Sequence, residues 1–143
     1  MRNNALVMSR SNRVGKILIA VFAELGIEYR ISTSISETLD IVAANQHAAL
    51  VVDFDMPDAV SVARIARMLP PKQRPVLFGA VGAATPVRDV IEAGAHFVLY
   101  KPLDLLQVLH SFRAAQGFMG QNGADLEIGR KIFSEQLRFA PSL

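Results

Sequence analysis

The sequence contains no cysteine among its 143 residues. This excludes disulfides, thiolate nucleophiles and thiolate metal sites, and it is typical of proteins in a reducing cytoplasm. Long hydrophobic runs are missing as well, because runs such as residues 48–52 and 97–100 have the length of a strand and are far too short for a membrane span. A run of only four apolar residues, 5–8, precedes Ser9 and Arg10, so we expect no signal peptide and a cytoplasmic location.

Charge of one sign is not in large excess either. The chain has 15 lysines and arginines against 13 acidic residues, a net charge of +2, and the charges are spread evenly. Such a balance does not indicate binding to nucleic acid. Hydrophobic residues make up 51% of the chain and charged residues 20%, which excludes a disordered protein and predicts one compact domain with a buried core.

Apolar runs of strand length alternate with helical patterns along the chain. We expect strands over residues 5–8, 28–33, 48–52, 76–80 and 97–100. We expect helices over 14–25, from Ser34 or Ser36 onward, and over 58–69, 85–93 and 103–116, the last with Leu105, Leu106, Leu109 and Phe112 buried. The alternation predicts an α/β fold with a parallel sheet that is covered by helices on both faces.

The pattern changes after Gln116. Residues 117–123 form a glycine-containing linker, and the segment beyond it is weakly amphipathic, with apolar residues at Leu126, Ile132, Phe133 and Leu137. We therefore divide the chain into a globular domain over residues 1–117 and a linker with a C-terminal amphipathic tail over residues 118–143.

Several polar residues follow the predicted strands. In doubly wound α/β sheets, ligands gather at the carboxyl ends of the strands, near the switch point in strand order. The residues at these ends are Ser9 and Arg10, Ser34, Asp53, Ala80 and Lys101. Any site of this domain is expected among them.

Asp53-Phe54-Asp55-Met56-Pro57 matches the Asp-x-x-Met-Pro motif of response-regulator receiver domains in two-component signalling. Pro75-Val76-Leu77-Phe78, and Gly94-Ala95 followed by Lys101-Pro102, resemble further parts of that family, over about residues 4–117. The resemblance implies a flavodoxin-like (CheY-like) doubly wound five-stranded sheet with strand order 2-1-3-4-5. It also implies that Asp53 is the phosphoacceptor position, in a site that binds Mg²⁺ when it is active.

The chain departs from the receiver pattern at the other site positions. The acidic pair after the first strand aligns with Ser9 and Arg10, the hydroxyl position with Ala80, and the aromatic position with Val98. Arg10 would stand where the metal binds, and we expect it to pair with Asp53 and, with Lys101, to keep that carboxylate ionised. The sequence thus predicts a pseudo-receiver that has no cofactor, is not an enzyme and acts through protein contacts.

Several alternatives stay open. Asp53 could be a working phosphoacceptor, or a structural ion pair with Lys101 or Arg10. Asp53, Asp55 and Asp58 could form a metal cluster, although the resemblance gives Asp55 a backbone role and Asp58 suits a helix cap. Contacts with nucleic acid through Arg130, Lys131 and Arg138 are a further, less favoured alternative, because acidic residues nearly cancel the charge of the tail.

The expected partners are proteins. An effector domain, a histidine kinase or a second copy of the chain would suit the resemblance, whereas a membrane would not. By analogy with receivers, a homodimer would use the surface of residues 85–93, 97–100 and 103–116. The cluster of Arg64, Arg67, Lys72 and Arg74 is either a solvated edge or a site for an acidic partner.

Overall fold

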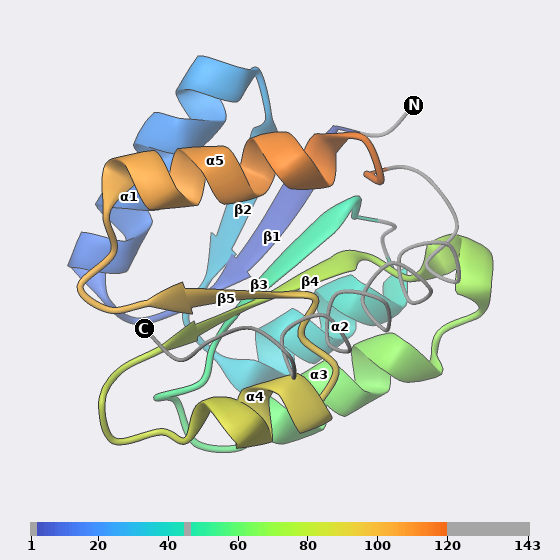
Figure 1. The fold of residues 1–143 in the computed structure, drawn as a ribbon. Coiled ribbons are helices and arrows are strands. Elements are labelled where there is room, and N and C mark those ends of the chain that lie inside the picture. The colour runs from blue at the N-terminus through green and yellow to red at the C-terminus, as the bar shows by residue number, and fades with distance from the viewer. Residues whose placement is uncertain (1–2, 45–46, 120–143) are drawn as a thin grey trace, which may run out of the picture.

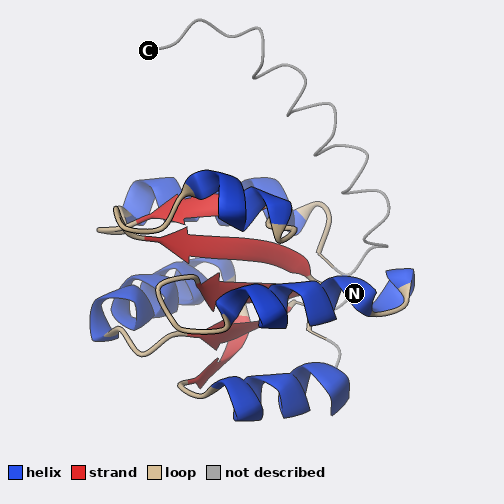
Figure 2. Ribbon diagram, turned by 90° about the horizontal axis from the view of Figure 1, so that it is seen from below, coloured by secondary structure: helices blue, strands red, loops and turns tan. Residues whose placement is uncertain are grey.

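The computed structural model describes residues 3–44 and 47–119. The predicted linker, beyond its first residues, and the amphipathic tail lie outside the described residues. So do Arg130, Lys131 and Arg138, which carry the nucleic-acid alternative. The described part contains a central sheet with helices packed on each side (Figures 1 and 2).

Five parallel strands form the sheet in the order β2-β1-β3-β4-β5, which confirms the predicted topology. The strands are β1 (Asn4–Met8), β2 (Glu28–Ser32), β3 (Ala49–Asp53), β4 (Val76–Val81) and β5 (Phe97–Tyr100). The central strands β3 and β4 are buried along their whole length. Their nearly continuous apolar sequences are typical of a parallel strand that has helices on both of its faces.

Two layers of helices cover the sheet. The helices are α1 (Asn12–Leu25), α2 (Ile35–Ala44), α3 (Ala59–Met68), α4 (Val87–Glu92) and α5 (Leu105–Gln116), with a short 3₁₀ turn at Pro71–Gln73. Residues of α1 and α5 share one apolar core with one face of the sheet, and residues of α2, α3 and α4 share a second core with the other face. Phe78 of β4 stacks on Phe112 of α5, with ring centroids 4.1 Å apart.

The start of α5 differs from the prediction. Leu105 and Leu106 are 45% and 61% exposed, whereas Phe112 is buried as predicted and Leu109 is partly buried. Val108 and Ala115 are the other buried side chains of the helix. Asp104 caps the helix by accepting a hydrogen bond from the backbone N–H of Leu106, which fixes where the first turn begins. The helical period therefore turns the two leucines toward solvent.

None of the helices in residues 3–44 and 47–119 combines the length and the apolar character needed to cross a bilayer.

Candidate functional site

Asp53 lies at the carboxyl end of the central strand β3. The four residues before it, Ala49 to Val52, are buried and apolar, so the strand carries the carboxylate from the core to the edge of the sheet. The Asp53 side chain is 4% exposed. A carboxylate so thoroughly buried needs hydrogen-bond partners and a compensating charge.

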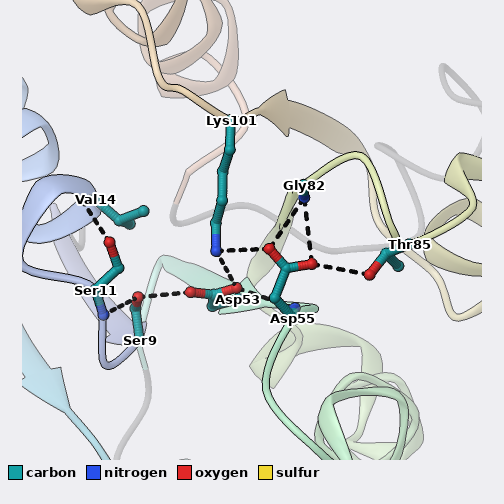
Figure 3. Close-up of polar contacts among 8 residues, drawn as sticks. All are labelled: Ser9, Ser11, Val14, Asp53, Asp55, Gly82, Thr85 and Lys101. Atoms are coloured by element: carbon teal, nitrogen blue, oxygen red, sulfur yellow. Dashed lines mark hydrogen bonds and ion pairs between the residues drawn. The ribbon is translucent and has the colours of Figure 1, made fainter.

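Asp53 finds these partners at the ends of β1 and β5 and in the turn that follows β3 itself (Figure 3). Ser9, directly after β1, donates its hydroxyl to Asp53 Oδ2 at 2.8 Å. Lys101, directly after β5, donates from Nζ to Asp53 Oδ1 at 2.7 Å, and the backbone N–H of Asp55 donates to the same oxygen at 3.0 Å. Both carboxylate oxygens are thus hydrogen-bonded, and the ammonium group supplies the positive charge.

The predicted ion pair between Arg10 and Asp53 is wrong. Arg10 Nε donates instead to the backbone carbonyl of Thr33, which follows β2, at 2.9 Å. Successive side chains at the end of a strand point in opposite directions, so Ser9 faces Asp53 and Arg10 turns toward the neighbouring strand. Of the two ion pairs that the sequence left open for Asp53, the structure contains the one with Lys101.

Ala80 and Val98 lie where the sequence places them, but neither provides a polar or aromatic group. Ala80 is fully buried in β4 and lies opposite Asp53 in the register of the sheet. Val98 is a partly buried residue of β5 that packs against the second core. Tyr100 is the exposed aromatic residue of β5, with 55% of its surface accessible.

The side chain of Asp55 makes more contacts than the sequence predicted, because the resemblance gave this residue only a backbone role. Its carboxylate accepts hydrogen bonds from Lys101 Nζ at 2.9 Å, from Thr85 Oγ1 at 2.8 Å, and from the backbone N–H of Gly82 at 3.1 and 3.2 Å. The alternation of side chains after β3 does place Asp55 on the same side as Asp53. No sequence signal, however, brought Gly82 and Thr85 to this carboxylate.

The charges of the site stabilise one another. The pKa of Asp55 is lowered, chiefly by the hydrogen bond from Lys101 and further by those from Thr85 and Gly82, although burial opposes the shift. Burial lowers the pKa of Lys101, but its hydrogen bonds to Asp53 and Asp55, together with their negative charges, outweigh that effect and raise it above the ordinary value. The ammonium form of Lys101 is therefore the stable one.

The donor set does not suit Mg²⁺. Magnesium binds through several oxygen ligands in octahedral geometry. Here the positions of the two expected acids hold Ser9 and Arg10, and the remaining carboxylates of the site share the ammonium group of Lys101. Within residues 3–44 and 47–119, no three acidic, histidine or cysteine side chains are grouped so that they could hold a metal ion.

Asp58 does not join Asp53 and Asp55, and it does not cap α3 in the expected way. It precedes the helix with a left-handed backbone conformation (φ 62°), and its side chain makes no capping hydrogen bond within the described part of the chain. Asp is one of the few residues other than glycine that adopts this conformation readily. The role of Asp58 is therefore in the turn between β3 and α3.

A cavity of about 580 Å³ opens beside Lys101. It lies between the start of α1, the loop after β4 and the loop after β5, with the apolar side chains of Val14, Ile17 and Leu103 in its wall. Arg13, Lys16 and Lys101 also line it. This side of the site is positively charged.

Solved structures with this fold include receiver domains and response regulators. A response regulator receiver protein from Burkholderia phymatum is 21% identical, covers 81% of this chain and 96% of its own, and has a TM-score of 0.68. A response regulator signal receiver domain from Bermanella marisrubri (18% identity, 80% and 98% covered) and the chemotaxis response regulator CheY4 of Vibrio cholerae (15%, 80% and 99%) both have TM-scores of 0.70. The sequence matches no family model and no curated protein. At these identities the similarity establishes the receiver fold.

Proposed function

We propose that this chain is an atypical receiver domain in signal transduction, which acts through protein contacts and has lost metal-dependent phosphorylation of Asp53. The observation that carries the proposal is the complete satisfaction of Asp53 by Ser9, Lys101 and a backbone N–H. A receiver of this kind is a cytoplasmic binding module with no enzymatic activity and no cofactor of its own.

Physical chemistry supports the loss of phosphorylation. A phosphoryl donor is strongly anionic, and transfer to a carboxylate needs cations that neutralise the developing charge. In this site, Mg²⁺ would have to displace Lys101 from two carboxylates without gaining a third acidic ligand. Lys101 and Mg²⁺ would also repel each other. Both effects weaken metal binding beside Asp53.

The test is a titration of the full chain with Mg²⁺ and beryllofluoride, followed by amide NMR. We expect millimolar concentrations of both to leave the amide signals of Asp53, Gly82 and Lys101 unchanged. The matched variant is Ser9→Asp with Arg10→Asp, which restores two acidic residues after β1 and should respond to Mg²⁺ alone. Saturable shifts in the unmodified chain at its Asp53 and Gly82 signals would overturn the proposal.

The second candidate function is a working receiver domain in which Asp53 is still the phosphoacceptor. The contact of 2.7 Å between Lys101 Nζ and Asp53 Oδ1 favours it, because a lysine so placed could also hold a phosphoryl oxygen. Intact-mass measurement after incubation with acetyl phosphate and Mg²⁺ separates the two functions. Addition of one phosphoryl group to the unmodified chain, but not to Asp53→Asn, would establish this candidate.

The partner surface that we propose consists of α4, β5 and α5. β5 is an edge strand of the sheet, and both helices contact it. The large apolar side chains exposed on this surface are Ile91, Tyr100, Leu105 and Leu106. An effector domain, a histidine kinase or a second copy of the chain would bury these side chains on binding.

A further inference from the structure

The carboxylate of Asp55 connects three separate segments of the chain. Asp55 itself follows β3, Lys101 follows β5, and Gly82 and Thr85 belong to the loop between β4 and α4. We call the three donor groups, Lys101 Nζ, the Gly82 N–H and Thr85 Oγ1, the Asp55 cradle (Figure 3). Charge-assisted hydrogen bonds such as these are about twice as strong as neutral ones.

Gly82 permits the close approach of the carboxylate to the loop. A Cβ atom at this position would lie only 2.8 Å from Asp55 Oδ2. Any side chain at residue 82 would therefore push the carboxylate away from the backbone N–H that it contacts. The glycine and the aspartate fit each other, although they are 27 residues apart.

The Asp55 cradle lies directly before the start of α4. Gly82 comes directly after the last residue of β4, and its carbonyl accepts a hydrogen bond from the N–H of Thr85 at 3.3 Å. Pro86 and the first residue of α4, Val87, follow at once. When both ends of this short loop are held, the first turn of α4 has little freedom to move relative to β5.

We infer that Asp55 is a positioning residue, whose side chain is a built-in anion that holds the β4–α4 loop in one conformation without any modification of Asp53. The consequence of this inference for partner binding rests on the proposed function, because the loop leads into the surface of α4, β5 and α5. The contact of Asp55 with the loop is independent of the proposed function. The state of that surface would then depend on the charge of residue 55.

Amide hydrogen exchange of the full chain, without metal or phosphoryl donor, tests this inference. In Asp55→Asn we expect exchange at Gly82 and Thr85 to be about tenfold faster, since a charge-assisted hydrogen bond is lost. The matched control is Asp58→Asn, which removes the same charge three residues away and should change exchange at these amides less than twofold. The pKa of Lys101, measured by NMR, should fall in Asp55→Asn and stay the same in the control.

A second variant opens the Asp55 cradle without removing its charge. In Gly82→Ala the new methyl group displaces the carboxylate, so exchange at Thr85 should rise about as much as in Asp55→Asn. Combining both substitutions should add little, because each removes the same interaction. Unchanged exchange in Asp55→Asn, or an equal increase in Asp58→Asn, would overturn the inference. A response of the unmodified chain to beryllofluoride would instead overturn the proposed function alone.

Discussion

Ser9 and Asp53 are joined by a hydrogen bond of 2.8 Å from the serine hydroxyl to Oδ2 of the carboxylate. Both residues are buried, and 44 positions of sequence separate them. An acid at residue 9 would repel Asp53, whereas the serine stabilises it. The same hydroxyl accepts from the backbone N–H of Ser11, the residue that caps α1 (Figure 3).

Substitution of Ser9 by alanine should destabilise the domain by about 1–2 kcal/mol, because it leaves a buried carboxylate oxygen without its donor. The free energy of unfolding in urea measures this cost. Ser61→Ala is the matched control, since Ser61 is an exposed residue of α3 and alanine favours a helix. Equal stability of Ser9→Ala and the unmodified chain would contradict the assigned role of Ser9.

Replacement of Lys101 by methionine should cost about 2 kcal/mol, because it removes the cation that compensates the buried charge of Asp53. The loss should be smaller when Asp53→Asn is introduced as well, and a double-mutant cycle measures that coupling. Arg88→Met is the control, since the ion pair of Arg88 with Glu92 is 4.0 Å long and its side chains are 85% and 70% exposed. Its expected cost is below about 0.5 kcal/mol. Additive costs of Lys101→Met and Asp53→Asn would show that the two side chains do not interact.

The pair of Lys101 and Asp55 should give the domain a stability that depends on pH at both extremes. Because the pKa of Asp55 is lowered, its contribution is complete above the ordinary value of 3.8 and is lost as the pH falls through the folded-state pKa. Because the pKa of Lys101 is raised, its contribution is complete below 10.5 and is lost as the pH rises through the folded-state pKa.

Urea unfolding over this pH range should therefore show that the unmodified chain exceeds Asp55→Asn in free energy of unfolding at neutral pH, and that this difference shrinks in acid. Asp55 is 34% exposed, so screening by water and salt limits the difference to about 1 kcal/mol or less. A difference that stays constant from neutral pH down through the unfolding transition in acid would contradict the assignment. It would mean that the carboxylate charge of Asp55 does not stabilise the fold.

Self-association through α4, β5 and α5 should depend on Leu106, which is 61% exposed. Leu106→Glu would place a charge in the apolar contact and should weaken a dimer at least tenfold, or roughly 1.4 kcal/mol. Sedimentation of the full chain over a range of concentrations measures this effect. Met68→Glu is the control, because Met68 is 80% exposed on α3, whose helix layer lies on the opposite face of the sheet from α5 and Leu106. A chain that stays monomeric throughout would exclude this dimer.

The sequence predicted the strands well, because the apolar runs of parallel strands are local signals, and the resemblance carried by the motif around Asp53 implied their order, which the structure confirms. It misassigned Arg10, because charge alone suggested a partner, whereas the direction of the side chain is set by the pleat at the end of β1. It also placed Leu105 and Leu106 in the core. The cap at Asp104 and the core position of Val108 decide the helix phase. The cap is a local hydrogen bond, whereas the position of Val108 depends on packing.

Asp55 and Thr85 show a different limit of sequence reasoning. The two side chains are 30 positions apart and meet only because the loop after β4 bends toward β3. A sequence pattern describes neighbours along a helix or a strand, but it does not describe the path of a loop. The local pattern therefore correctly gave the side of the sheet on which Asp55 lies, and left its partners undetermined.

The carboxylate in the Asp55 cradle is attached to the chain, and this distinguishes it from any anion that diffuses. Its local concentration beside Gly82 and Thr85 is fixed by the short stretch of backbone that follows β3, whatever the composition of the surrounding solution. A free anion such as phosphate would have to compete with a group that loses almost no translational entropy on binding. The conformation of the loop is thus set when the protein folds and is insensitive to the supply of small anions.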